Sequence, residues 1–384
     1  MTERPLESDV ALVRCDRYDP DLVFEAVGRG LALLGGADKF AKSGERILLK
    51  PNLLAGSAPD KAVTTHPVLF SAVARHVQAM GVRLTYGDSP GFGRAESAAR
   101  HSKIAEAAEA LGIPMADFTN GKTASFPEGR LVKQFTVAAG VLDADGIISL
   151  PKLKTHALTR MTGAVKNQFG CIPGLLKGEF HARMPELERF SQMLVDLVRF
   201  LRPRLYVMDA IVAMEGNGPR GGVPKQVSAL LFSTDPVALD AAACAIIGLD
   251  PGLVPTIRWG EEFGLGLAKP LHIVGDALDS FTVADFVANR ASAPITSSLP
   301  GVPAWILRRY VISRPAIESV RCSRCGTCVK VCPATPKALS FGKGAKQPPV
   351  YDYDACIRCY CCQELCPDHA IGIQKTKLGG LLRL

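Results

Sequence analysis

The chain has 384 residues, of which 47% are apolar, and it carries a formal charge of +8 at pH 7. This length and apolar content predict two or three domains with a large buried core. The sequence holds no run of eighteen apolar residues and opens on a segment with acids and no apolar stretch, so we expect neither a transmembrane helix nor a signal peptide. The moderate positive charge, without an aromatic and basic pattern, favours an anionic small molecule or an acidic protein over nucleic acid.

Helix and strand patterns alternate along the first 290 residues. Apolar residues recur at helical spacing from about Asp21 to Leu31, and Pro67 stands at the favoured first position of a helix that runs to about Met80. Further helices are expected over 95–111, 187–201 and 236–247, and buried strands over 47–49, 84–86, 146–150, 205–208, 229–232 and 271–274. This alternation predicts an α/β fold with a mostly parallel sheet and helices on both faces.

Polar side chains follow several of the predicted strands. These are Lys50 and Asn52, Asp88 and Ser89, Lys152, Lys154 and His156, Asp209, and Asp235. Because ligands of open α/β sheets bind beyond the carboxyl ends of the strands, we expect a site there. Asp235 precedes Pro236, which favours a plain helix N-cap. His66 and Asp88 stay open between a site role and a local one, as a helix-start residue and a turn former respectively.

The segment from Lys152 to Gly170 concentrates positive charge and contains no acid. Such a loop beside a cleft suits a carboxylate or phosphate substrate, whereas a solvated basic face is the alternative. We expect His156 and Lys166 to be proton donors, with Asp88 orienting one of them. The expected substrate-binding residues are Lys50, Asn52, His66, Ser89, Lys152, Lys154, Asn167 and Asp209. The glycine-rich stretch 216–222 matches no dinucleotide or P-loop pattern, which favours an ordinary loop over a phosphate-binding one.

Nine of the twelve cysteines lie in the last 63 residues. Two copies of the run C-x2-C-x2-C-x3-C-P begin at Cys322 and Cys356, a pattern typical of a bacterial-type ferredoxin module with two 4Fe-4S clusters. In such modules the fourth cysteine of each run ligates the other cluster. The predicted ligands are Cys322, Cys325, Cys328 and Cys366 for cluster one, and Cys356, Cys359, Cys362 and Cys332 for cluster two. Structural zinc sites are the alternative.

The distribution of residue types along the chain predicts its domain boundaries and its cellular location. We predict an α/β domain over 1–290, a linker rich in Pro and Ser over 291–317, and a two-cluster module with a basic tail over 318–384. Three scattered cysteines do not form a disulfide framework, so we expect a reducing, cytoplasmic location. Cys171 is expected to be a buried apolar residue, and the extra thiol of Cys361 has no assigned role.

Six short motifs together resemble a known family. They are Lys50-Pro51-Asn52, Thr65-His66-Pro67, Gly87-Asp88-Ser89-Pro90, Lys152-Leu153-Lys154-Thr155-His156, Val165-Lys166-Asn167-x-Phe169-Gly170 and Thr234-Asp235-Pro236. With the cysteine runs, they are similar to the iron–sulfur members of the domain-of-unknown-function 362 family, over roughly residues 10–290. The spacing of His156 and Lys166 also resembles a loop of the nickel-pincer lactate racemase family. That likeness implies a cofactor or substrate pocket at this loop, without the nickel cofactor.

These observations lead to one main hypothesis and two alternatives. We expect an iron–sulfur oxidoreductase, a reductase, whose two clusters take electrons from an external ferredoxin or flavoprotein and pass them to an anionic small molecule in the α/β cleft. In the first alternative the α/β domain docks a partner protein and the chain is an electron-transfer adaptor. In the second, the clusters are structural and the enzyme is not redox-active. The position of the cluster module relative to the loop 152–167 distinguishes the first two.

Overall fold

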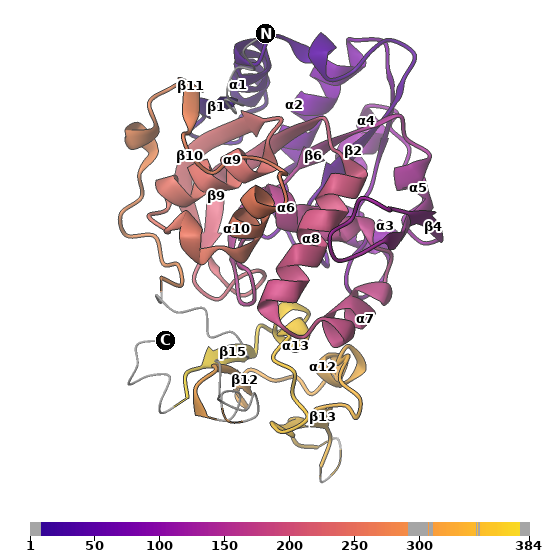
Figure 1. Cartoon of the computed structure of the whole chain (residues 1–384), viewed down its shortest axis with the longest axis vertical. Helices are drawn as coiled ribbons and strands as arrows, with labels where there is room; N and C mark the ends of the chain where they lie inside the picture. The colour runs from indigo at the N-terminus through magenta and orange to yellow at the C-terminus, as the bar shows by residue number, and fades with distance from the viewer. Residues whose placement is uncertain (1–8, 291–305, 307–309, 343, 345, 377–384) are drawn as a thin grey trace.

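The computed structural model describes residues 9–290, 306, 310–342, 344 and 346–376. A large α/β domain with a nine-stranded mixed sheet carries the smaller C-terminal domain at one end (Figure 1). The α/β class predicted from the alternation of elements is confirmed.

The main sheet contains β1 (Asp9–Arg14), β2 (Arg46–Pro51), β3 (Arg83–Tyr86), β6 (Gly146–Leu150), β7 (Lys152–His156), β8 (Arg160–Thr162), β9 (Leu205–Glu215), β10 (Val223–Ser233) and β11 (His272–Gly275). The helices are α1 (Pro20–Leu33), α2 (Pro67–Gln78), α3 (Ala95–His101), α4 (Ile104–Ala110), α5 (Ala139–Leu142), α6 (Ala164–Asn167), α7 (Leu176–Arg183), α8 (Leu187–Leu201), α9 (Pro236–Ile246), α10 (Pro255–Glu262), α12 (Thr327–Lys330) and α13 (Cys361–Glu364). The smaller strands are β4 (Gly121–Ser125), β5 (Gln134–Ala138), β12 (Arg314–Ile317), β13 (Leu339–Ser340), β14 (Val350–Tyr351) and β15 (Ile371–Gln374), and short 3-10 turns connect several elements.

The strand order in the main sheet is β11-β1-β10-β9-β6-β2-β3, with β7 beside β9 and β8 beside β7. Five neighbouring pairs are parallel, and β10 runs antiparallel to both β1 and β9. The sequence predicted only four residues for each of β9 and β10. They extend to eleven residues each because they form one long hairpin, in which polar residues such as Asp209 and Gln226 continue the pairing.

Alternate side chains of the strands enter two apolar cores, one on each face of the sheet. Leu48 joins the core covered by α6, α8, α9 and α10, whereas Ile47 and Leu49 join the core covered by α1, α2 and α4. A parallel strand buried on both faces shows this continuous apolar run. The predicted helices on both faces of the sheet are therefore confirmed, and α8 has the predicted bounds, 187–201.

Three local expectations differ from the structure. The helix expected over 95–111 is two helices, α3 and α4, because Lys103 between them adopts a left-handed backbone conformation with φ of 62°. The residues after Pro151 form the hairpin β7–β8 instead of a loop. Strand β1 was not predicted from the sequence. Its partners β10 and β11 come more than 200 residues later in the chain.

The C-terminal domain consists of two small antiparallel sheets, β12 with β15 and β13 with β14, and the short helices α12 and α13. Most of the predicted linker, 291–317, lies outside the described residues, as do residues 1–8 and 377–384, so the predicted domain boundaries stay predictions. Across the described residues, no helix is both long and apolar enough to cross a membrane.

The buried face of α8 allows a stability test. Leu194 is fully buried in the core under α8, so Leu194→Ala is expected to lower the free energy of unfolding by about 2–5 kcal/mol, through lost burial and an unfilled cavity. Arg189 is exposed on the same helix, and Arg189→Ala should change the free energy of unfolding by less than about 0.5 kcal/mol. Urea unfolding of both variants measures the difference, and equal losses would contradict the placement of α8.

Candidate functional site

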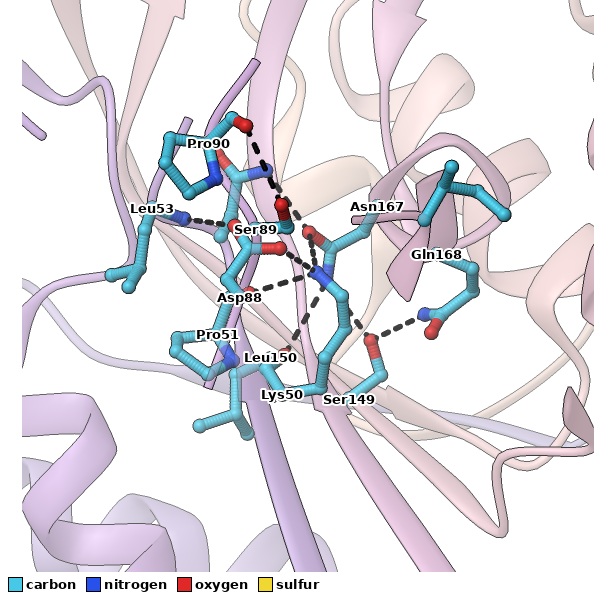
Figure 2. Close-up of polar contacts among 12 residues, drawn as sticks. Lys50, Pro51, Leu53, Asp88, Ser89, Pro90, Ser149, Leu150, Asn167 and Gln168 are labelled. Carbon is cyan, nitrogen blue, oxygen red and sulfur yellow. Dashed lines mark hydrogen bonds and ion pairs between the residues drawn. The ribbon is translucent and has the colours of Figure 1, made fainter. Parts of the chain in front are cut away.

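A buried ion pair lies at the end of β2, between Lys50 and Asp88 (Figure 2). The Lys50 ammonium donates to Asp88 Oδ1 at 2.8 Å and to Asn167 Oδ1 at 3.2 Å, and the backbone N–H of Leu53 donates to Asp88 Oδ2 at 2.7 Å. A Cβ on Gly170 would lie 1.7 Å from Asp88 Oδ1, so this position admits only glycine. Lys50 is thus a fully buried counter-ion that fixes Asp88.

A second buried pair joins Lys152 of β7 to Asp209, which lies within β9 and not at its end. Lys152 Nζ is 3.0 Å from Asp209 Oδ2 and donates to the Tyr18 hydroxyl at 2.8 Å, and that hydroxyl donates to Asp209 Oδ1 at 2.7 Å. Burial lowers the pKa of Lys152, and Asp209 offsets part of this effect. His66 stacks on Tyr18 and caps α2, because its Nδ1 accepts from the N–H of Val68 at 3.2 Å.

A cavity that is partly open to solvent lies beside these pairs. Its polar lining residues include seven that the sequence predicted, namely Asn52, Asp88, Ser89, Lys154, His156, Lys166 and Asn167. Lys50, His66, Lys152 and Asp209 are not in the lining. Their side chains are used instead in buried pairs and a helix cap that support the cavity wall, and a direct contact of these four with a substrate stays a prediction.

Sequence reasoning missed three lining residues that carry ionisable groups. Lys177 and His181 lie on α7, and Glu364 lies on α13 of the C-terminal domain. No motif contained them, because α7 follows the basic segment and Glu364 lies inside a cysteine run. A chain-wide search for helical residues i and i+4 with ionisable groups would have found Lys177 and His181, whereas Glu364 carries no signal.

The lysines of the cavity are buried and held mainly by neutral oxygens. Lys154 Nζ donates to Asn52 Oδ1 at 2.7 Å and to the Val63 carbonyl at 2.5 Å, and burial lowers its pKa to about 7. Lys177 Nζ donates to the carbonyls of Ile172, at 2.5 Å, and Pro90, and burial likewise lowers its pKa to about 7.

Lys166, the third lysine of the lining, sits differently. Its ammonium lies 4.9 Å from the centre of the Phe169 ring. Among the described residues it makes no hydrogen bond or close ion pair. This ammonium therefore faces the cavity with its donors free.

His156 and the carboxylate of Glu364 lie next to each other in the cavity lining. The Nδ1 of His156 accepts from the N–H groups of Leu158, at 3.0 Å, and Thr159, at 3.3 Å, so the proton of the neutral ring is on Nε2. His156 Nε2 is buried, lies 3.6 Å from Glu364 Oε2 and has no hydrogen-bond partner. Burial lowers the pKa of His156.

Glu364 keeps its negative charge at this buried position. Burial by itself would raise its pKa, but the charge of Lys166 and the contact with His156 hold it well below the usual value. Asp88 was expected to orient His156 or Lys166, and this prediction is wrong. Asp88 is bonded to Lys50 and to the N–H of Leu53, so Glu364 is the carboxylate beside His156.

The glycine-rich loop 216–222 attaches the C-terminal domain. Gln363 Nε2 donates to Asn217 Oδ1 at 2.9 Å and to the Gly218 carbonyl at 3.1 Å. A Cβ on Gly218 would lie 2.2 Å from the Thr155 carbonyl, so glycine lets this loop approach β7 closely. It thereby places α13, with Cys361, Glu364 and Leu365, in the wall of the lysine cavity.

Two smaller cavities lie inside the C-terminal domain. One is lined by Cys322, Cys325, Cys328 and Cys366, and the other by Cys332, Cys356, Cys359 and Cys362. These are the two ligand sets predicted from the spacing, including the exchange of the fourth cysteines. Within the described part of the chain, no three or more His, Cys, Asp or Glu side chains converge on a single ion. Eight thiols around two cavities fit two iron–sulfur cubes.

The surroundings of the thiols also fit clusters. The Tyr351 hydroxyl lies 3.3 Å from Cys362 Sγ, and the N–H of Ala370 donates to Cys366 Sγ at 3.4 Å. Hydrogen bonds to ligand sulfurs tune cluster potentials. Two residues of the lysine cavity, Cys361 and Val331, are direct chain neighbours of cluster-two ligands, whereas Cys325 of cluster one is exposed.

Comparisons with known proteins agree with this arrangement. Residues 47–245 match the family described as domain of unknown function (DUF362), and residues 314–368 match the 4Fe-4S dicluster domain. The chain belongs to the DUF362 family. The dicluster match supports 4Fe-4S ligation in this DUF362 protein and indicates iron–sulfur electron transfer.

A curated relative of this DUF362 protein is the thylakoid-associated protein sll1697 of Synechocystis sp. (strain ATCC 27184 / PCC 6803 / Kazusa), 40% identical over 261 residues, which are 67% of this chain and 79% of the relative. Among solved structures, the lactate racemase apoprotein of Thermoanaerobacterium thermosaccharolyticum has a TM-score of 0.41 at 11% identity, over 63% of this chain and 58% of that one. A Thermotoga maritima protein has a TM-score of 0.35 at 11% identity, over 58% and 57%. The chain thus spans less than two thirds of either solved structure.

The exchanged cysteines predict which variants lose the same cluster. Cys332→Ala and Cys359→Ala should both lower the iron content from about eight atoms per chain to about four and leave the same electron paramagnetic resonance signal, that of cluster one. Cys325→Ala and Cys366→Ala should share the other signal. Cys361→Ala is the control and should keep both clusters. If Cys332→Ala instead matched Cys325→Ala, the exchange would be wrong.

Proposed function

We propose that this protein is an iron–sulfur reductase that passes electrons through two 4Fe-4S clusters to an anionic small molecule in the lysine-lined cavity. The observation that carries the proposal is the position of α13. This helix belongs to the dicluster domain, yet it supplies Cys361 and Glu364 to the wall of the cavity in the α/β domain. A predicted cluster ligand, Cys362, and two residues of a candidate substrate site thus share one short helix.

When bound, the clusters supply one-electron equivalents, and two of them match a two-electron reduction without a flavin. The reduction is balanced when the substrate gains two electrons, from an external ferredoxin or flavoprotein, and two protons. The exposed position of Cys325 makes the cluster-one side the expected docking place of that donor. A cytoplasmic location stays a prediction.

The cavity residues would bind the substrate and hold protons. Lys154, Lys166 and Lys177 attract its negative charge, and the ammonium groups of Lys154 and Lys177 can release protons near neutral pH because burial lowers their pKa to about 7. The Nε2–H of His156 is a fixed donor to a substrate oxygen. Glu364 keeps the proton on this nitrogen by its negative charge.

Reoxidation of the clusters tests the proposal against its alternatives. Oxygen-protected protein is reduced chemically and mixed with unsaturated and oxo carboxylates, while the visible absorbance of the clusters is followed. We expect reoxidation by one class of carboxylate without any added protein. Reoxidation that requires a partner protein would favour the adaptor, and a reaction that proceeds with redox-inactive clusters would favour a nonredox enzyme.

Replacing Lys166 should lower turnover without affecting assembly of the clusters. Lys166→Met is expected to lower turnover by about 100-fold or more, because it removes a positive charge and a proton donor from the cavity, while the iron content is unchanged. Lys122, an exposed lysine on β4, provides the control variant Lys122→Met. Full turnover of Lys166→Met with intact clusters would remove Lys166 from the mechanism, and His156→Ala tests His156 in the same way.

The lowered lysine pKa values predict a pH dependence. Below about pH 7 Lys154 and Lys177 are positively charged and bind an anion, whereas above it they lose their protons. The kcat/KM for the anionic substrate should therefore fall as the pH rises above about 7, since kcat/KM reports the free enzyme. Lys154→Met should make the decline less steep. A flat profile for the unaltered protein would contradict the role of these lysines.

A further inference from the structure

The positive charges of the cavity are not balanced by the protein itself. Asp88 is already paired with Lys50, behind the cavity wall. Of the other acidic groups in the described part of the chain, Glu364 is the one in the cavity lining. It offsets one of the three lysines Lys154, Lys166 and Lys177, so two positive charges remain when all three are protonated. A ligand with two negative charges would neutralise them.

The lysines also belong to different walls. Lys154 extends from β7 and is anchored by Asn52 and the Val63 carbonyl, whereas Lys177 extends from α7 and is anchored by the carbonyls of Pro90 and Ile172. Lys166 extends from α6 and lines the same cavity as the other two lysines. Three cations on separate elements favour two separate anionic groups over one oxyanion.

Other features of the lining fit a ligand with an apolar middle and a polar acceptor. Phe169 and Leu365 are buried apolar residues of the lining, and they offer contact area to a short carbon chain. His156 lines the cavity, and its buried Nε2 lies 3.6 Å from Glu364 Oε2, a distance longer than a hydrogen bond. Buried polar groups in proteins are normally hydrogen-bonded, so this nitrogen indicates a missing acceptor.

From these contacts we propose that the cavity binds a small dicarboxylate, with one carboxylate at Lys154 and the other at Lys177, and that Lys166 adds a third positive charge to the same cavity. That the bound dicarboxylate is reduced rests on the proposed function, whereas its binding can be measured without any reaction. The inference names the substrate class as dicarboxylates, in place of anions in general.

Calorimetric titration of the full chain, with both clusters intact and oxidised, tests the inference independently of turnover. The probes are succinate, glutarate, butyrate and inorganic phosphate. We expect the better of the two dicarboxylates to bind at least about tenfold more tightly than butyrate or phosphate, because it alone engages both ends. Equal binding of butyrate, tighter binding of phosphate, or no binding of any probe would overturn the inference.

Two variants show whether binding uses the named lysines. Lys166→Met should weaken dicarboxylate binding by about tenfold or more, and Lys177→Met should reduce the preference for dicarboxylates over butyrate, while Lys122→Met changes neither. Unchanged preference in a folded Lys177→Met protein would overturn the assignment of the second carboxylate. Because Lys166 also helps to hold the buried Glu364 ionised, urea unfolding and the iron content of Lys166→Met are compared with those of the unaltered protein, and only a folded variant with both clusters counts.

Proton uptake gives a second readout on the unaltered protein. At about pH 8 Lys154 and Lys177 are mostly neutral, and a bound dianion should raise their pKa, so binding should take up protons. Titrations in two buffers of different ionisation enthalpy measure this uptake, which should be smaller at about pH 6. Binding without uptake at pH 8 would contradict the two-lysine site. If dicarboxylates bind as expected but never reoxidise the clusters, the proposed reductase fails while the site stands.

Discussion

A carboxylate from the far end of the chain lies among the buried cations of the α/β domain. Glu364 of α13 is held ionised by Lys166 and His156, and Gln363 beside it is bonded to the loop after β9. Removing charged groups from water is costly unless opposite charges or hydrogen bonds compensate. The contact between the two domains and the electrostatics of the cavity therefore depend on the same few atoms, and a movement of the dicluster domain would change the charge of the site.

Two other ion pairs, Lys50 with Asp88 and Lys152 with Asp209, are fully buried beside the cavity. In the sequence, these four residues resemble binding residues because they are polar and follow the predicted strands. In the structure they connect β2, β7 and β9 to the loops that carry the lining residues. Breaking such a pair leaves an uncompensated charge in a medium of low dielectric constant, so these residues support the site.

The dicluster domain combines local and long-range constraints. Three cysteines of each run lie within one short loop and helix, so one cluster would bring them together with little change of the chain. The fourth cysteine of each run lines the cavity of the other set. This exchange ties the two runs into one unit, and α13, which carries a ligand of cluster two, is the element that reaches the α/β domain.

The amino-acid sequence by itself determined the α/β class and most helices and predicted the two sets of four cysteines, because these follow from the spacing of residues along the chain. It also marked Lys154, His156, Lys166 and Asn167 as cavity residues. Only the tertiary structure decided that Lys50 and Lys152 are neutralised by acids from distant segments of the chain, and that Lys177 and Glu364 complete the cavity. The physical reason is that a lysine carries the same charge everywhere in a sequence, whereas its partner and its exposure to water depend on segments far apart in the chain that only folding brings together.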